Sequence, residues 1–185
     1  SLRRHGVDEG LLPKAEVLQR VREESHRRTA MHLLAQIGIS EAFECSTLNA
    51  IHDLIYKYNK VVAKAPWSSS GRGIRFLDDT LDEHTQGWLR NTLRHQGTVM
   101  IEPLYNKVMD FGMEFYRYPD GKVEYLGLSL FQTVNGAYTG NLLVTETVKR
   151  DILSRYISLD DLDAFTSAAC DYLGANLSYT GPFGI

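Results

Sequence analysis

A lysine followed by a loop of small residues could bind phosphate. Lys64 follows the apolar run Val61-Val62-Ala63, and a segment rich in serine and glycine comes shortly after it. Small side chains let backbone N–H groups approach phosphate oxygens, as in anion-binding nests. The Lys64 ammonium would add a fixed positive charge, and a guanidinium could donate paired hydrogen bonds. The loop candidates are Ser68, Ser69, Ser70, Gly71, Arg72 and Gly73.

The loop fits neither of the common phosphate-binding motifs. It does not match GxxxxGK[ST], and it does not open a helix as the Rossmann glycine motif does. The same residues also suit a solvent-exposed loop between two strands, with a lysine that has no special role. Composition leaves both interpretations open.

The tripeptide Glu102-Pro103-Leu104 could bind the edge of an adenine ring. It follows an apolar strand and offers a carboxylate and backbone groups. Pro103 has no N–H group, so the backbone donor would be the amide of Leu104. Asp110, eight residues after Glu102, could accept hydrogen bonds from ribose hydroxyls. A strand that ends in a charged residue and a solvated edge aspartate are the alternative interpretations.

Periodicity predicts the elements that must position these residues. The predicted helices share an apolar stripe at helical spacing and span residues 14–37, 46–58, 82–95, 146–156 and 159–173, with Ser46 and Ser158 as caps. The predicted strands are short apolar or alternating runs at residues 61–63, 74–77, 98–101, 109–118 and 123–131. Pro119-Asp120-Gly121 predicts a hairpin turn. Residues 136–141 are expected to form a loop, and residues 179–185 a turn that enters a strand.

Composition indicates a soluble globular protein. A chain of 185 residues can form one core or two small lobes, and its apolar fraction of 43% and charged fraction of 23% are ordinary. A net charge of −3 gives no general attraction to nucleic acid or to an anionic membrane. Cys45 and Cys170 have no metal-ligand spacing and are expected to be reduced thiols. A cytoplasmic location is the expectation.

The order of these motifs resembles the ATP-grasp superfamily, which includes biotin carboxylase, D-alanine–D-alanine ligase and glutathione synthetase. The shared pattern is strand, lysine, small-residue loop and strand, followed by a helix, a strand and a Glu-x-Leu segment. Residues 61–74 are similar to the family pattern without a gap, and Gly71-Arg72-Gly73 is similar to the biotin carboxylase version.

The resemblance implies roles for the candidates. Lys64 would contact the phosphates of ATP while the loop covers them, and Lys64 and Arg72 would hold phosphate charge during catalysis. Arg27, or its neighbour Arg28, would approach the phosphates from an earlier helix, where the family usually has a lysine.

The adenine and ribose contacts follow from the same resemblance. Glu102 would accept from the adenine amino group, and backbone groups of Pro103 and Leu104 would read the ring edge. Asp110 would bind the ribose.

The resemblance also implies an α+β fold in three parts. Residues 1–60 would form a helical N-terminal segment, and residues 61–104 a small lid lobe with a mixed or antiparallel sheet. Residues 105–185 would form a second lobe with an antiparallel sheet. The magnesium ligands of the family, an acidic residue followed by a Glu and an Asn, are expected beyond residue 185, so this fragment is predicted to be inactive by itself.

The implied activity is that of an ATP-dependent ligase. ATP and Mg²⁺ would activate a small-molecule carboxylate as an acyl phosphate, which an amine or a similar nucleophile then attacks. A kinase-type phosphoryl transfer is one alternative, and a non-catalytic domain that keeps the fold to bind a ligand or a protein is another.

Overall fold

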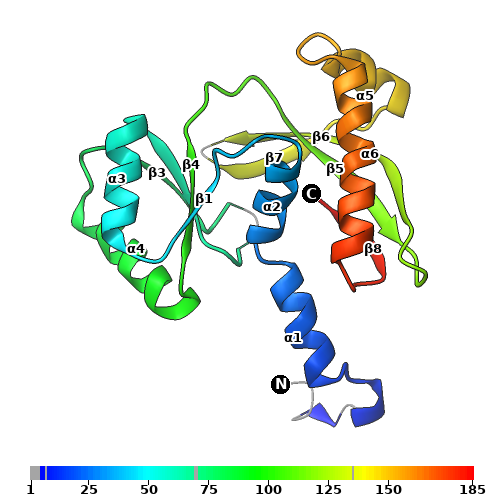
Figure 1. Ribbon diagram of the computed structural model, residues 1–185, viewed down its shortest axis with the longest axis horizontal. Coiled ribbons are helices and arrows are strands. Elements are labelled where there is room, and N and C mark those ends of the chain that lie inside the picture. Colours follow the sequence, from blue (N-terminus) through cyan, green and yellow to red (C-terminus); the bar gives the residue numbers. More distant parts are fainter. Residues whose placement is uncertain (1–4, 7, 69–70, 135) are drawn as a thin grey trace.

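The protein is an arrangement of two four-stranded antiparallel sheets with helices packed on them (Figure 1). This computed structural model describes residues 5–6, 8–68, 71–134 and 136–185. The predicted α+β class is confirmed. Among the described residues, no helix has the length and apolar character needed to cross a bilayer.

The first sheet carries helices on one face only. Its strand order is β1-β4-β2-β3. The strands are β1 (Phe43–Cys45), β2 (Val61–Lys64), β3 (Ile74–Leu77) and β4 (Val99–Pro103), and the helices are α3 (Leu48–Tyr58) and α4 (Glu83–Gln96). Val61 and Ala63 alternate toward this helical face and are fully buried in a core with Ile51 of α3 and Leu89 of α4.

The opposite face of this sheet, here called the inner face, looks toward the second sheet. Strand alternation puts Val62 and Lys64 on it, opposite Phe76 and Ile74 of β3. A Cβ atom built on Gly136, in the turn that ends β6, would lie 3.8 Å from the Ile74 side chain. The inner face is therefore the surface through which the two sheets approach each other.

The second sheet has the order β7-β6-β5-β8 and packs against two helices. The strands are β5 (Asp110–Arg117), β6 (Val123–Val134), β7 (Ala137–Asn141) and β8 (Gly181–Gly184), and the helices are α5 (Glu146–Leu153) and α6 (Leu159–Asn176). Phe115 and Met113 of β5 alternate into a core that Leu162 and Leu173 of α6 complete.

A short 3-10 turn, η2 (Glu9–Leu11), and two helices, α1 (Ala15–Glu24) and α2 (Arg28–Gln36), precede the first sheet. Figure 1 shows α1 projecting away from both sheets, and it buries none of its side chains. In contrast, Leu33 of α2 is buried in the core of the second sheet and its helices.

The prediction of one helix over residues 14–37 is wrong, because the chain breaks between α1 and α2. The His26 side chain is only 4% exposed, and its Nδ1 accepts a hydrogen bond from the Arg28 amide at 2.9 Å. The Arg27 amide donates to the Pro66 carbonyl, 3.3 Å away in the loop after β2. Both amides thus leave the helical pattern, the Arg28 amide for a local side chain and the Arg27 amide for a tertiary partner.

Two other local predictions are corrected, and one strand was missed. Thr47, rather than Ser46, caps α3 by accepting from the Ala50 amide at 3.2 Å. The expected loop at residues 136–141 contains β7, which pairs with β6 through Phe131 and Asn141. β1 was not predicted.

Several predictions are confirmed. The strand at residues 74–77 has the predicted bounds, and Ser158 caps α6. Tyr118 and Gly121 close the predicted turn with a 3.0 Å backbone hydrogen bond.

β1 and α3 lie before residue 61 in the chain, yet they complete the first sheet and its helical cover.

The buried His26 should make stability depend on pH. Burial lowers the pKa of His26 and the charge of Arg28 lowers it further, while Glu44 acts in the opposite direction. Because the unfolded chain takes up this proton near pH 6.5 and the folded chain only at lower pH, stability should fall as pH drops below about 6.5. A difference of one bound proton changes the free energy of unfolding by at most about 1.4 kcal/mol per pH unit.

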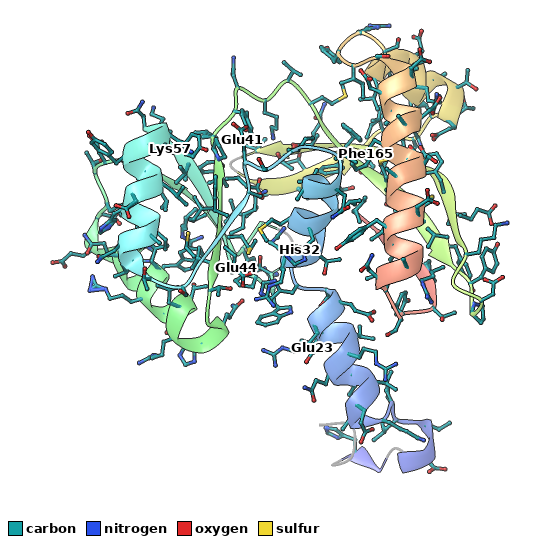
Figure 2. All side chains as sticks on the ribbon, viewed as in Figure 1. Glu23, His32, Glu41, Glu44, Lys57 and Phe165 are labelled. Atoms are coloured by element: carbon teal, nitrogen blue, oxygen red, sulfur yellow. The ribbon has the colours of Figure 1, made fainter. Side chains whose placement is uncertain are left out.

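The measurement is urea unfolding of the wild type and of His26→Gln at pH 7.5 and pH 5.5. The glutamine keeps an acceptor for the Arg28 amide but does not titrate, so its loss of stability between the two pH values should be smaller. His32→Gln is the matched control, since His32 is exposed on α2 (Figure 2). Equal pH dependence in wild type and His26→Gln would contradict the assignment.

Candidate functional site

An ion pair between Lys64 and Glu102 lies on the inner face. The Lys64 Nζ atom is 2.5 Å from Glu102 Oε2. Lys64 is opposite Met100 in the β2–β4 register and Glu102 is opposite Val62, so the two side chains are diagonal neighbours on one face. Their side chains are 24% and 35% exposed.

This pair places an ammonium and a carboxylate side by side. The Lys64 ammonium has three N–H donors, and one contact to a half-exposed carboxylate leaves others available. A phosphate oxygen could take the place of Glu102 at Lys64. The freed carboxylate of Glu102 could then accept a hydrogen bond from an amino group.

Arg27 extends the positive charge of this site. Its Nε donates to the Ala65 carbonyl at 3.1 Å, and its Nη2 lies 3.3 Å from both the carbonyl and the hydroxyl oxygen of Ser68. Burial lowers the pKa of Arg27, and the nearby charge of Glu102 acts in the opposite direction. Arg27, Lys64, Ser68 and Glu102 are therefore brought together.

Arg28, the alternative to Arg27, points to a different partner. Its guanidinium makes a two-pronged ion pair with Glu44 of β1, with Nε at 2.7 Å from Oε2. Figure 2 shows Glu44 on the side of the first sheet that approaches the α1–α2 break. Arg28 thus joins the N-terminal helices to β1, and only Arg27 contacts the candidate site.

The β2–β3 loop, of which residues 65–68 and 71–73 are described, approaches the turn between β6 and β7 at Gly71. Gly71 has φ +71°, and a Cβ atom there would lie 2.1 Å from the Gly136 carbonyl oxygen. A Cβ atom on Gly73 would lie 2.3 Å from the Ser68 side chain. Glycine is therefore required at both positions by close approach. The candidates Ser69 and Ser70 lie outside the described residues.

Arg72 is not placed with Lys64. It is exposed, and it lines a hollow of about 340 Å³ together with Trp88, Asn91 and His95 of α4. That hollow lies on the helical side of the first sheet, since the helical-face residue Ala65 and α4 form its walls.

The segment Glu102-Pro103-Leu104 ends β4 as expected, but one of its groups is already used. The Leu104 amide donates to the Lys60 carbonyl at 3.0 Å. The backbone donor for an adenine edge therefore cannot be this amide in the observed arrangement. Beyond it, the exposed Tyr105 donates its hydroxyl hydrogen to Glu41, and this contact raises the pKa of Tyr105 to about 12.

Asp110 begins β5 and lies in a separate polar cluster. Its Oδ2 atom is 2.5 Å from Lys107 Nζ and accepts from Thr133 Oγ1 at 2.6 Å. These three residues line a hollow of about 280 Å³ with apolar walls that include Phe131 and Leu142. Sequence reasoning missed Lys107 and Thr133. The β5–β6 register brings Thr133 to Asp110, whereas Lys107 lies only three residues before Asp110.

No metal site is preformed among the described residues. Within the described ranges, no three or more His, Cys, Asp or Glu side chains are grouped so that they could hold an ion. Cys45 is buried, Cys170 is half-buried, and burial raises the pKa of both thiols.

Comparisons with solved structures find the same arrangement of elements in larger enzymes. N5-carboxyaminoimidazole synthetase from Staphylococcus aureus, solved with ADP, matches 86% of this chain with a TM-score of 0.55 and 11% identity. D-alanyl-alanine synthetase A from Vibrio cholerae matches 87% with a TM-score of 0.54 and 13% identity. Biotin carboxylase from Campylobacter jejuni, solved with a nucleotide, matches 86% with a TM-score of 0.55 and 14% identity.

This chain covers only part of each of these enzymes: 39% of the first, 50% of the second and 36% of the third. No protein-family model matches the sequence, and a sequence comparison with curated proteins finds no match. Identities this low establish a shared fold and nothing finer. The described residues have the fold of part of the ATP-grasp enzymes, as the sequence resemblance implied.

Proposed function

We propose that this chain binds ATP or ADP at the inner face of the first sheet, with the phosphates at Lys64 and the base near the end of β4. The observation that carries the proposal is the Lys64–Glu102 pair, which presents a cation and a carboxylate side by side at 2.5 Å. The fold supports it, because two of the matched enzymes were solved with a nucleotide.

The residues present fit the phosphate end of a nucleotide. Lys64 exchanges Glu102 for a phosphate oxygen, and Arg27 supplies a second cation that is already held in place by Ala65 and Ser68. The backbone of the β2–β3 loop would cover the phosphates. Gly71 of this loop lies against the Gly136 carbonyl, so this part of the loop is next to the second sheet.

The base and sugar are proposed to lie along the connection from β4 to β5. Glu102 accepts from the adenine amino group once Lys64 has turned to the phosphates. Because the Leu104 amide is bonded to Lys60, the ring edge would be read by the Leu104 carbonyl and by backbone after residue 104. Asp110, with Lys107 and Thr133, offers hydrogen-bonding groups to the ribose.

For the whole protein we propose ATP-dependent activation of a small carboxylate as an acyl phosphate, followed by attack of an amine or similar nucleophile. Mg²⁺ would neutralise the charge on the phosphates during this step. Lys64 and Arg27 would add fixed electrostatic stabilisation, and Arg72 would join them only if the loop rearranges.

Hydroxylamine trapping tests this chemistry. The whole protein is incubated with ATP, Mg²⁺, the carboxylate and hydroxylamine. An acyl phosphate formed from the carboxylate would react with hydroxylamine to give a hydroxamate. A phosphorylated hydroxyl acceptor without hydroxamate would show kinase-type transfer instead.

Nucleotide binding is tested by thermal unfolding with ATP or ADP, with and without magnesium. At a hundred times its Kd, a nucleotide adds about 2.7 kcal/mol, which is a rise of roughly 5 to 10 °C in Tm for a chain of this length. Lys64→Met should remove this rise, because the phosphates lose their central cation.

Lys122→Met is the matched control. It also deletes one positive charge, but Lys122 is exposed in the turn between β5 and β6, so the rise in Tm should persist. Because Lys64→Met leaves Glu102 without its partner, the double variant with Glu102→Gln checks that the fold survives. A full nucleotide shift in Lys64→Met would refute the proposed phosphate site.

A further inference from the structure

A further pocket lies between the N-terminal helices and the edge of the second sheet. Its volume is about 560 Å³, within the range of small-molecule sites. The lining is predominantly apolar and comes from α1, α2, α6 and β8. The apolar members are Val21, Ala30, Leu33, Leu173, Leu177, Pro182, Phe183 and Ile185.

Among the charged residues that line this pocket, Arg27 has hydrogen-bond donors left for a ligand. The Glu24 carboxylate lines the pocket, but it already accepts from the Ser178 amide at 2.7 Å and the Tyr179 amide at 2.9 Å. The His26 ring accepts from the Arg28 amide, and burial lowers its pKa. Arg27 also lines the pocket, and its Nε and Nη2 atoms hold the β2–β3 loop. A guanidinium has five N–H donors, so Arg27 can serve another acceptor in the pocket.

Arg27 connects this pocket to the proposed phosphate site. It contacts Ser68 of the β2–β3 loop, and the nearby charge of Glu102 acts to raise its pKa. A ligand whose anionic group meets Arg27 would therefore present that group beside the nucleotide phosphates, while its apolar body fills the space between α2 and β8.

We propose that this pocket binds a small carboxylate with an apolar body, held by Arg27 at its carboxylate and by Leu33, Leu173 and Phe183 at its body. This inference rests on the proposed function in one respect, since it names the carboxylate that ATP would activate. The binding itself does not require nucleotide.

The test uses 3-phenylpropanoate as the probe in a ligand-observed NMR titration without nucleotide. We expect saturable binding, and weaker binding by at least about tenfold for 3-phenylpropanamide, which cannot form the charge-assisted pair with Arg27, and for acetate, which lacks the apolar body. Equal affinity for the acid and its amide would overturn the assignment of Arg27.

Ala30→Leu tests the location. Ala30 is exposed on α2 and lines the pocket, so a leucine there fills it without entering the core, and 3-phenylpropanoate should bind at least about tenfold more weakly. Ala35→Leu makes the same change elsewhere on the exposed surface of α2 and should leave affinity unchanged. Unchanged affinity in Ala30→Leu would overturn the pocket.

The outcome is separable from that of the nucleotide proposal. Ala30→Leu should keep the full nucleotide shift in Tm, because Lys64 and Glu102 are not touched. Failure of 3-phenylpropanoate binding with an intact, Lys64-dependent nucleotide shift overturns only the pocket. Binding of the probe without any nucleotide shift overturns only the nucleotide site.

Discussion

The close pairing of Lys64 with Glu102 is the constraint on which the proposed site depends. It exists because β2 and β4 are neighbouring antiparallel strands whose alternation sends both side chains to the face without helices. The opposite face is filled by a dry core around Val61, Ala63 and Ile101. The two partly buried charges cost desolvation free energy, which their mutual attraction offsets. A phosphate group could replace Glu102 as the partner of Lys64 and so offset the desolvation cost of the lysine.

The break between α1 and α2 ties the N-terminal helices to this site. His26 packs edge-on against Trp67 with ring centroids 4.6 Å apart, and the Trp67 indole nitrogen donates to the Arg22 carbonyl at 2.7 Å. Arg27 is thereby carried to the β2–β3 loop, while Leu33 is buried against α6. One short segment thus joins the β2–β3 loop, the first sheet and the helices of the second sheet.

Local signals in the sequence were sufficient where local interactions decide the structure. The cap of α6 at Ser158, the turn at residues 119–121 and the β2–β3 hairpin all have partners within a few residues or one loop. The break at His26 depends on Trp67 and Pro66, about forty residues away, so helical periodicity could not reveal it. Lys64 and Glu102 were each candidates, but only the β2–β4 register shows that they touch. Thr133 was missed for the same reason, since only the β5–β6 register brings it to Asp110.

Calorimetric titration with pyrophosphate tests the central claim most directly, because pyrophosphate has no base and reports only on the phosphate site. If Glu102 competes with phosphate for Lys64, Glu102→Gln should tighten pyrophosphate binding by about tenfold, or about 1.4 kcal/mol. Glu124→Gln removes the same charge from the exposed end of β6 and should have little effect. Adding Lys64→Met to Glu102→Gln should abolish the gain. Equal pyrophosphate affinity in the wild type and Glu102→Gln would contradict the account.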